Sequence, residues 1–137
     1  MFKALEISTS GLVAQRHRIN SIAGNIANIN TTRNEKCEVS PFQRRLVTFM
    51  ADTSSRSSEA EGVGVKFTVS TDTDLPERSV YQPGHPDADS NGIVHFPGIS
   101  LTTEFVNAVE ASRAYEANVA AIDVSKSIIT ETLKILA

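Results

Sequence analysis

Several features that mark common classes of protein are scarce or missing in this sequence. Its 137 residues include one cysteine and no tryptophan. That cysteine, Cys37, excludes an internal disulfide framework and any metal site built only from cysteines. No apolar run approaches the roughly 20 residues that a membrane-spanning helix needs, so we expect no transmembrane segment. With a formal net charge of −3 and a pI near 5.6, the chain has no broad cationic surface for nucleic acid.

Catalytic signatures are equally scarce. The three histidines, His17, His85 and His95, form neither an i,i+4 pair nor a spaced set of metal ligands. Cys37 has no base beside it in the sequence to activate it as a nucleophile. No glycine-rich phosphate loop stands between a strand and a helix. We therefore expect a protein that is not an enzyme, with no catalytic residue, cofactor or metal site.

Both ends of the sequence carry apolar residues in helical register. A seven-residue repeat keeps one narrow stripe of a helix facing a partner along its length. The N-terminal columns comprise Leu5, Leu12, Ile19 and Ile26, with Ile22 and Ile29 beside them. The C-terminal columns comprise Leu101, Ala108, Tyr115, Ile122, Ile129 and Leu136, backed by Phe105, Val119 and Leu133. These columns predict one helix over residues 2–27 and another that follows Pro97-Gly98 and is capped by Ser100 or Thr102.

Between the helices the apolar period changes to two, which is typical of strands. The pattern predicts strands at residues 42–49, 63–70, 80–81 and 93–96, with a serine-rich loop at 52–61. We expect an α+β fold in which long terminal helices pack as a coiled-coil-like core around a small β-rich insertion. The corresponding regions are an N-terminal core helix (1–30), a β-rich middle (31–98) and a C-terminal core helix (99–137).

One constellation suggests a metal site. Asp87, Asp89, Asn91 and Gly92 reproduce the first half of an EF-hand calcium loop. The second half fails, because its twelfth position should carry a bidentate glutamate and here is Gly98. A tight turn built from Asx hydrogen bonds is the favoured interpretation. A small calcium-binding module is kept as an alternative.

The helical stripes predict assembly. If the two ends faced only each other, Val109, Val124, Ile128 and Ile135 would lie outside the seam, so more helical neighbours are needed. Polymerisation of this protein, or of related proteins, supplies them; a dimeric coiled-coil adaptor in the cytoplasm is a second alternative. The predicted helix-packing interface comprises Leu5, Leu12, Ile19, Ile22, Ile26, Phe105, Tyr115, Val119, Ile122, Ile129, Leu133 and Leu136.

Three stretches of the sequence are similar to a known family. They cover residues 10–16 running on to 25–32, residues 83–94, and residues 110–119. These stretches make the chain resemble bacterial flagellar basal-body rod proteins, and in particular the subunits of the proximal rod. The resemblance covers nearly the whole length of the chain. The residues that carry the resemblance include Asn25, Asn28, Asn30, Thr31, Pro83, Gly84, Pro86, Asp87, Asp89, Asn91, Gly92, Arg113, Tyr115 and Asn118. The chain departs from the family pattern at Ile29, Cys37, Phe42 and Phe105.

The resemblance implies a role in the flagellum. It implies export through the flagellar type III apparatus, which fits an N-terminus without the pattern of a cleavable signal peptide. Other copies of the chain and other flagellar rod proteins are the implied partners, in a periplasm-spanning drive shaft that carries motor torque to the hook. The terminal helices would line the inner tube, and the strand-rich middle would lie outside it.

Overall fold

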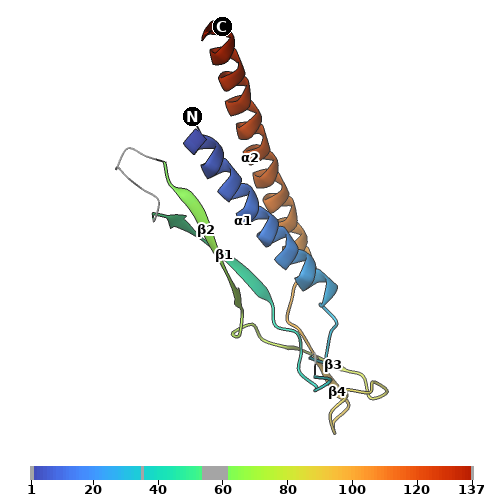
Figure 1. The fold of residues 1–137 in the computed structure, drawn as a ribbon. Helices are drawn as coiled ribbons and strands as arrows, with labels where there is room; N and C mark the ends of the chain where they lie inside the picture. The colour runs from blue at the N-terminus through green and yellow to red at the C-terminus, as the bar shows by residue number, and fades with distance from the viewer. Residues whose placement is uncertain (1, 35, 54–61, 137) are drawn as a thin grey trace. The chain divides into compact units, whose positions relative to one another are not determined.

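Two long helices, one at each end of the chain, flank a small group of strands in the sequence, as expected for an α+β fold. The computed structural model describes residues 2–34, 36–53 and 62–136. The elements follow in the order α1 (Phe2–Ala27), β1 (Arg45–Asp52), β2 (Gly64–Thr71), β3 (Arg78–Tyr81), β4 (Ile93–Phe96) and α2 (Leu101–Leu136) (Figure 1). Most of the predicted loop at 52–61 lies outside the described residues. No described helix is long and apolar enough to cross a membrane.

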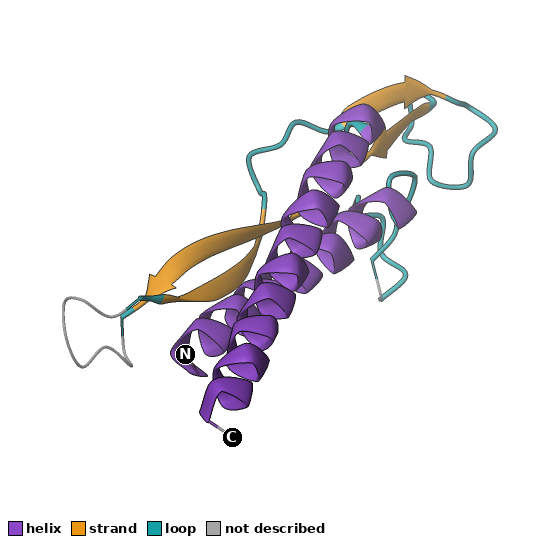
Figure 2. Cartoon of the chain, turned by 90° about the horizontal axis from the view of Figure 1, so that it is seen from above, coloured by secondary structure: helices purple, strands orange, loops and turns teal. Residues whose placement is uncertain are grey.

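The strands form two separate pairs (Figure 2). β1 pairs with β2, and β3 runs antiparallel to β4 with Arg78 opposite Phe96 and Tyr81 opposite Ile93. The predicted bounds of β4 are confirmed, and those of β2 and β3 are shifted or extended by one or two residues. The first strand was predicted at 42–49 and begins instead at Arg45. The reason is that the amide of Phe42 donates to the carbonyl of Thr31, so this segment pairs with the backbone that follows α1.

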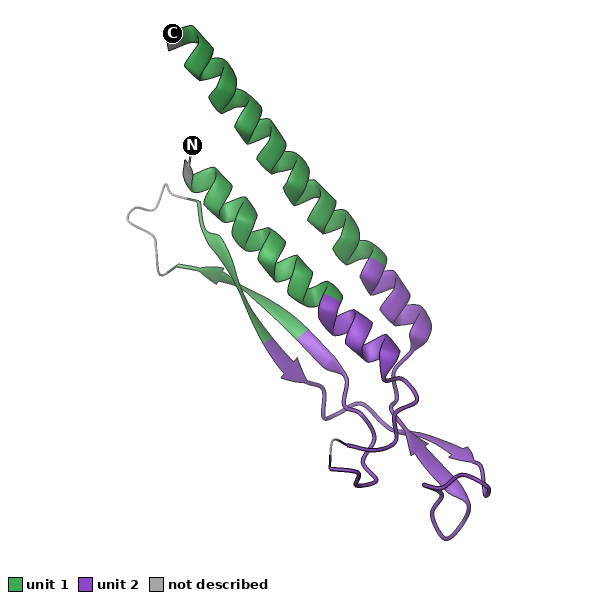
Figure 3. Ribbon diagram, turned by 45° about the vertical axis from the view of Figure 1, so that its right-hand side comes forward, with its two compact units in different colours: residues 1–19, 47–68, 109–137 green, residues 20–46, 69–108 purple. Residues whose placement is uncertain are grey.

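The protein divides into two compact units (Figure 3). The first unit comprises Met1–Ile19, Val47–Thr68 and Val109–Ala137. The second unit comprises Asn20–Leu46 and Val69–Ala108.

In the first unit, α1 and α2 lie side by side and antiparallel (Figure 3). Their seam is built from small and polar residues. Ala14 and Ala111 are buried, Gly11 faces the side chain of Asn118, and Arg18 Nη2 donates to Glu110 Oε2 at 2.9 Å. Small side chains let the two helix backbones approach closely.

β2 packs against another side of α1 in the first unit. The amide of Val65 donates to Ser10 Oγ at 2.9 Å, and the ring of His17 stacks on Phe67 with the centroids 4.2 Å apart. A hydrogen bond and a ring contact therefore attach the strand to α1 at two points about two turns apart.

The core of the second unit lies around β4 and the segment that follows it. Val94 is fully buried, and Phe96 and Ile99 are nearly so. Between them, a Cβ added to Gly98 would overlap the carbonyl oxygen of Pro76. The fold therefore needs a residue without a side chain at this close approach.

A matched pair of glycine substitutions tests this close approach. We expect Gly98→Ala to lower the free energy of unfolding by about 1–3 kcal/mol, because the backbone around Pro76 must move to admit the methyl group. At Gly84 an added Cβ meets nothing within 4 Å, so Gly84→Ala is expected to be neutral or stabilising by up to about 1 kcal/mol. Urea denaturation measures both, and equal effects would contradict the overlap.

Candidate functional site

A buried polar cluster joins three segments of the second unit. Asn25 near the end of α1 and Glu104 in the first turn of α2 are each only 1% exposed. Asn25 Nδ2 donates to the carbonyl of Arg45 at 2.9 Å and to Glu104 Oε2 at 3.1 Å. The amide of Arg45 donates back to Asn25 Oδ1 at 2.8 Å. One amide side chain therefore fixes the start of β1 against both helices.

Arg44 supplies the positive charge of this cluster. Its Nε and Nη2 atoms donate to Glu104 Oε1 at 2.9 and 2.6 Å, and Nη1 lies 3.9 Å from Asp72 Oδ2. Both oxygens of the Glu104 carboxylate are thus bonded, as a buried charge requires. Asn25 was predicted as a family-motif residue, but the roles of Arg44 and Glu104 were missed. Sixty positions separate this pair in the sequence, so no local pattern indicates it.

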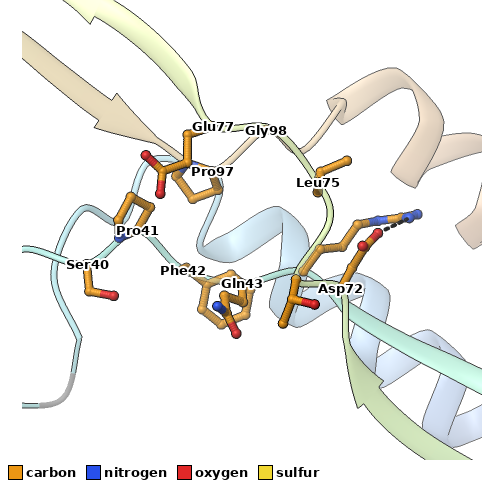
Figure 4. A pocket seen from close by; sticks show the side chains of 11 residues that line it. Ser40, Pro41, Phe42, Gln43, Asp72, Leu75, Glu77, Pro97 and Gly98 are labelled. Carbon is orange, nitrogen blue, oxygen red and sulfur yellow. Dashed lines mark ion pairs between the residues drawn. The ribbon is translucent and has the colours of Figure 1, made fainter.

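A cavity of about 100 Å³ adjoins Arg44 (Figure 4). Its charged groups already pair with one another or with neighbours. Arg44 contacts Glu104 and Asp72, and Glu77 lies 3.2 Å from the ring of His95. The arrangement is that of a structural salt-bridge network, and it presents no nucleophile activated by a base. The other residues that line the cavity are Ser40, Pro41, Phe42, Gln43, Thr73, Leu75, Pro97 and Gly98.

The aspartates of the calcium-like motif hold turns in the second unit. Buried Asp87 accepts a hydrogen bond from Arg33 Nε at 2.7 Å and another from Thr32 Oγ1 at 2.6 Å. The bond from Arg33, followed by that from Thr32, lowers the pKa of Asp87 below its usual value. Asp89 Oδ1 accepts the amides of Asn91 and Ile93, and the Ile93 bond contributes most to lowering the pKa of Asp89.

These bonds support the interpretation of the motif as a turn. The two carboxylates bond to different partners, and Gly92 takes a φ of +75° that favours glycine. Within the part of the protein that the structure describes, no group of three or more His, Cys, Asp or Glu side chains could hold a metal ion. The structure therefore gives no support to the calcium-binding alternative.

Other motif residues shape the ends and the seam of the helices. Asn28 Nδ2 donates to the carbonyl of Gly24 and closes the last turn of α1, while Thr31 Oγ1 donates to Asn28 Oδ1. Asn30 accepts from Arg78 at 3.3 Å. Asn118 lies in the α1–α2 seam of the first unit. By contrast, the remaining motif residues are exposed: Pro83, Gly84, Pro86, Arg113 and Tyr115.

The predicted interface residues divide by exposure. Large apolar side chains of α2 stand in solvent, among them Phe105 at 55%, Leu133 at 61%, and Tyr115 and Val119 at 37% each. Ile22 is 6% exposed and is buried inside the second unit. The side chain of Leu136 lies outside the described residues. The other members are half-buried: Leu5, Leu12, Ile19, Ile26, Ile122 and Ile129.

The stripe that meets α1 differs from the predicted one. Glu104 in the second unit, and Ala111 and Asn118 in the first, face α1, whereas Tyr115 and Val119 remain exposed. An apolar stripe is usually the seam of a helix pair. Here small and polar side chains form the seam, and most of the large apolar side chains of α2 lie outside it.

Comparison with known proteins gives matches at both ends of the sequence. Residues 5–33 match the family described as "Flagella basal body rod protein", and residues 90–135 match "Flagellar basal body rod FlgEFG protein C-terminal". Together these two matches are typical of a protein of the flagellar rod.

Relatives matched along nearly the whole chain identify which kind of rod protein it resembles. The flagellar basal-body rod protein FlgC of Salmonella typhimurium is 35% identical over 133 residues, which cover 97% of this chain and 96% of the relative. FlgC of Bacillus subtilis is 34% identical over 145 residues, covering 98% and 97%, and FlgC of Borreliella burgdorferi is 33% identical over 150 residues, covering 99% and 97%. The chain therefore belongs to the FlgC family of flagellar basal-body rod proteins, as a structural subunit of the rod.

Removing the positive partner tests the buried cluster. We expect Arg44→Ala to lower the free energy of unfolding by about 3–5 kcal/mol, because the Glu104 carboxylate then stays buried without its counter-charge. The control is Arg45→Ala, whose exposed side chain lies over the ring of Phe42 and is worth about 0.5–1 kcal/mol. Denaturant unfolding of both variants measures these changes. Similar losses of unfolding free energy in the two variants would contradict a special role for Arg44.

The lowered pKa of Asp87 predicts acid sensitivity. The ionised carboxylate stabilises the folded state above the unfolded pKa of roughly 4, and this contribution is lost as pH falls through the lower folded-state pKa. We therefore expect the stability difference between the wild type and Asp87→Asn to shrink as pH is lowered from the unfolded pKa of roughly 4 through the lower folded-state pKa of Asp87. Thermal melts across acidic pH measure it, with Asp123→Asn on the exposed surface of α2 as the control. A difference independent of pH would count against the account.

Proposed function

We propose that this protein is a subunit of the proximal rod, within the periplasm-spanning drive shaft that carries motor torque to the hook. It assembles there through its terminal helices with other copies of itself and with other rod proteins. It reaches the rod through the flagellar type III export apparatus. Membership of the FlgC family supports the assignment to the rod, and the surface of the helix pair supports the mode of assembly.

The observation that carries the proposal concerns the first unit. Each residue of an α-helix is rotated about 100° from the one before it. In two antiparallel helices, the residues that follow seam residues therefore lie on one common face. Leu12 follows Gly11, Ile19 follows Arg18, and Val119 follows Asn118. The apolar columns of both helices thus share a face.

The residues that precede seam positions on α1 lie on the opposite side, which is covered. Ser10 precedes Gly11 and bonds to Val65, while His17 precedes Arg18 and stacks on Phe67. β2 therefore contacts the side of α1 that carries Ser10 and His17, whereas Leu12 and Ile19 lie on the other side. Leu5 lines a pocket together with Val65 and Phe67 of β2.

An exposed apolar surface of this kind marks an interaction site. Helices of neighbouring subunits are suitable partners, because the columns repeat every seven residues and present regular knobs along the helix pair. Among the described residues of α2 in the first unit, Tyr115, Val119 and Leu133 are large, apolar and exposed on this face. Val109, Val124, Ile128 and Ile135 are also exposed, and they lie on other sides of α2. A cytoplasmic dimeric adaptor is not favoured, since the relatives matched along the whole sequence are rod proteins.

Two aspartate substitutions on α2 test this proposal. Leu133 is 61% exposed, so Leu133→Asp is expected to change the stability of the purified protein by no more than about 0.5 kcal/mol. In the assembly it places an unpaired charge in an apolar interface, which costs several kcal/mol in every subunit. We therefore expect cells with Leu133→Asp to make the protein but to lack hooks and motility.

The matched control is Ser127→Asp, which adds the same charge at an exposed position on a different face of α2. These cells should swim. Hook counts by electron microscopy and swimming assays measure the outcome, with immunoblots to confirm equal amounts of protein. Normal hooks and swimming in the Leu133→Asp strain would contradict assembly through this face.

A further inference from the structure

The loop before β4 contains the sole Asn-Gly step of the sequence, Asn91-Gly92. In such a step the backbone nitrogen of glycine attacks the carbonyl carbon of the asparagine side chain. A new C–N bond closes a succinimide, the original C–N bond of the asparagine amide group breaks, and ammonia leaves. Water then opens the ring to aspartate or isoaspartate. Glycine favours this reaction because no side chain obstructs the attacking nitrogen.

The structure holds that nitrogen in a hydrogen bond. The Gly92 amide donates to the backbone carbonyl of Asp89 at 3.0 Å. The amides on either side, of Asn91 and Ile93, both donate to Asp89 Oδ1 at 2.8 Å. Three successive backbone amides therefore bond to one residue.

A further bond closes this turn. The amide of Asp89 donates to the carbonyl of Ile93 at 2.9 Å, while Gly92 takes its φ of +75°. The backbone around Gly92 is thus fixed at both ends. Attack on Asn91 requires Gly92 to give up its bond and to rotate, and the two bonds to the Asp89 carboxylate oppose that rotation.

We propose that Asn91 is a site of spontaneous deamidation and that the side chain of Asp89 suppresses the reaction by holding the turn. The side chain of Asn91 is exposed, so water reaches the succinimide once it forms. The product adds a negative charge next to Asp89, and the isoaspartate form also lengthens the backbone by one carbon. Either change opposes the return of the turn to its original form.

The test compares deamidation rates of the full-length protein in mildly alkaline buffer. Mass spectrometry of the peptide that contains residues 89–93, with fragment ions that separate residue 89 from residue 91, measures conversion of the Asn91 amide to acid, and enzymatic methylation detects isoaspartate. We expect the native wild type to react about tenfold more slowly than the same protein in urea, since in urea the turn no longer restrains Gly92. We expect Asp89→Ala to react about tenfold faster than the native wild type, because both bonds to the carboxylate are lost.

The matched control is Asp89→Asn, which keeps an oxygen acceptor on the side chain and removes the charge. It should react at nearly the wild-type rate if hydrogen bonding is the cause. Circular dichroism confirms that each variant is folded under the assay conditions. Equal rates for native and urea-unfolded wild type, or for wild type and Asp89→Ala, would overturn the proposal. So would an Asp89→Asn rate as fast as that of Asp89→Ala, since charge would then be the cause.

Discussion

The buried carboxylate of Glu104 is the constraint on which the second unit depends. A buried charge is costly unless it is paired and fully hydrogen-bonded. Arg44 and Asn25 satisfy both oxygens, and Asn25 also bonds to the backbone of Arg45. The end of α1, the start of β1 and the first turn of α2 must therefore adopt one geometry together. The polar cluster supplies this specificity where few large apolar side chains are buried.

The first unit follows a different rule. Its helices meet through small residues such as Ala14 and Ala111, and most of the large apolar side chains of α2 remain in solvent. A monomer organised for its own stability would bury those side chains first. A rod subunit has another requirement, because its helices must present apolar surface to neighbours. The weak apolar core of the protein and its proposed assembly surface are thus two consequences of one arrangement.

Local signals in the sequence predicted much of the fold. The bounds of α1 and β4 are as predicted, because heptad periodicity, the asparagines after Ala27 and the Pro97-Gly98 break all act locally. β1 was misplaced because its start depends on backbone bonds to Thr31, which no local pattern indicates. For the candidate site, the heptad columns include the exposed Phe105, Tyr115, Val119 and Leu133 of α2, together with the half-buried Ile122 and Ile129. The columns could not indicate that Glu104 and small residues would form the seam. Glu104 lies there because it bonds to Asn25 and Arg44, which are 60 or more positions away in the sequence.

The central claim is that neighbouring subunits cover the apolar face of the helix pair. An electron cryo-microscopy map of the assembled rod, at a resolution that shows side chains, tests it most directly. The account predicts that Tyr115, Val119 and Leu133 lie within about 4.5 Å of apolar side chains of an adjacent subunit. A map in which this face lines open solvent, with contacts between subunits made only through the strand-rich middle, would contradict it.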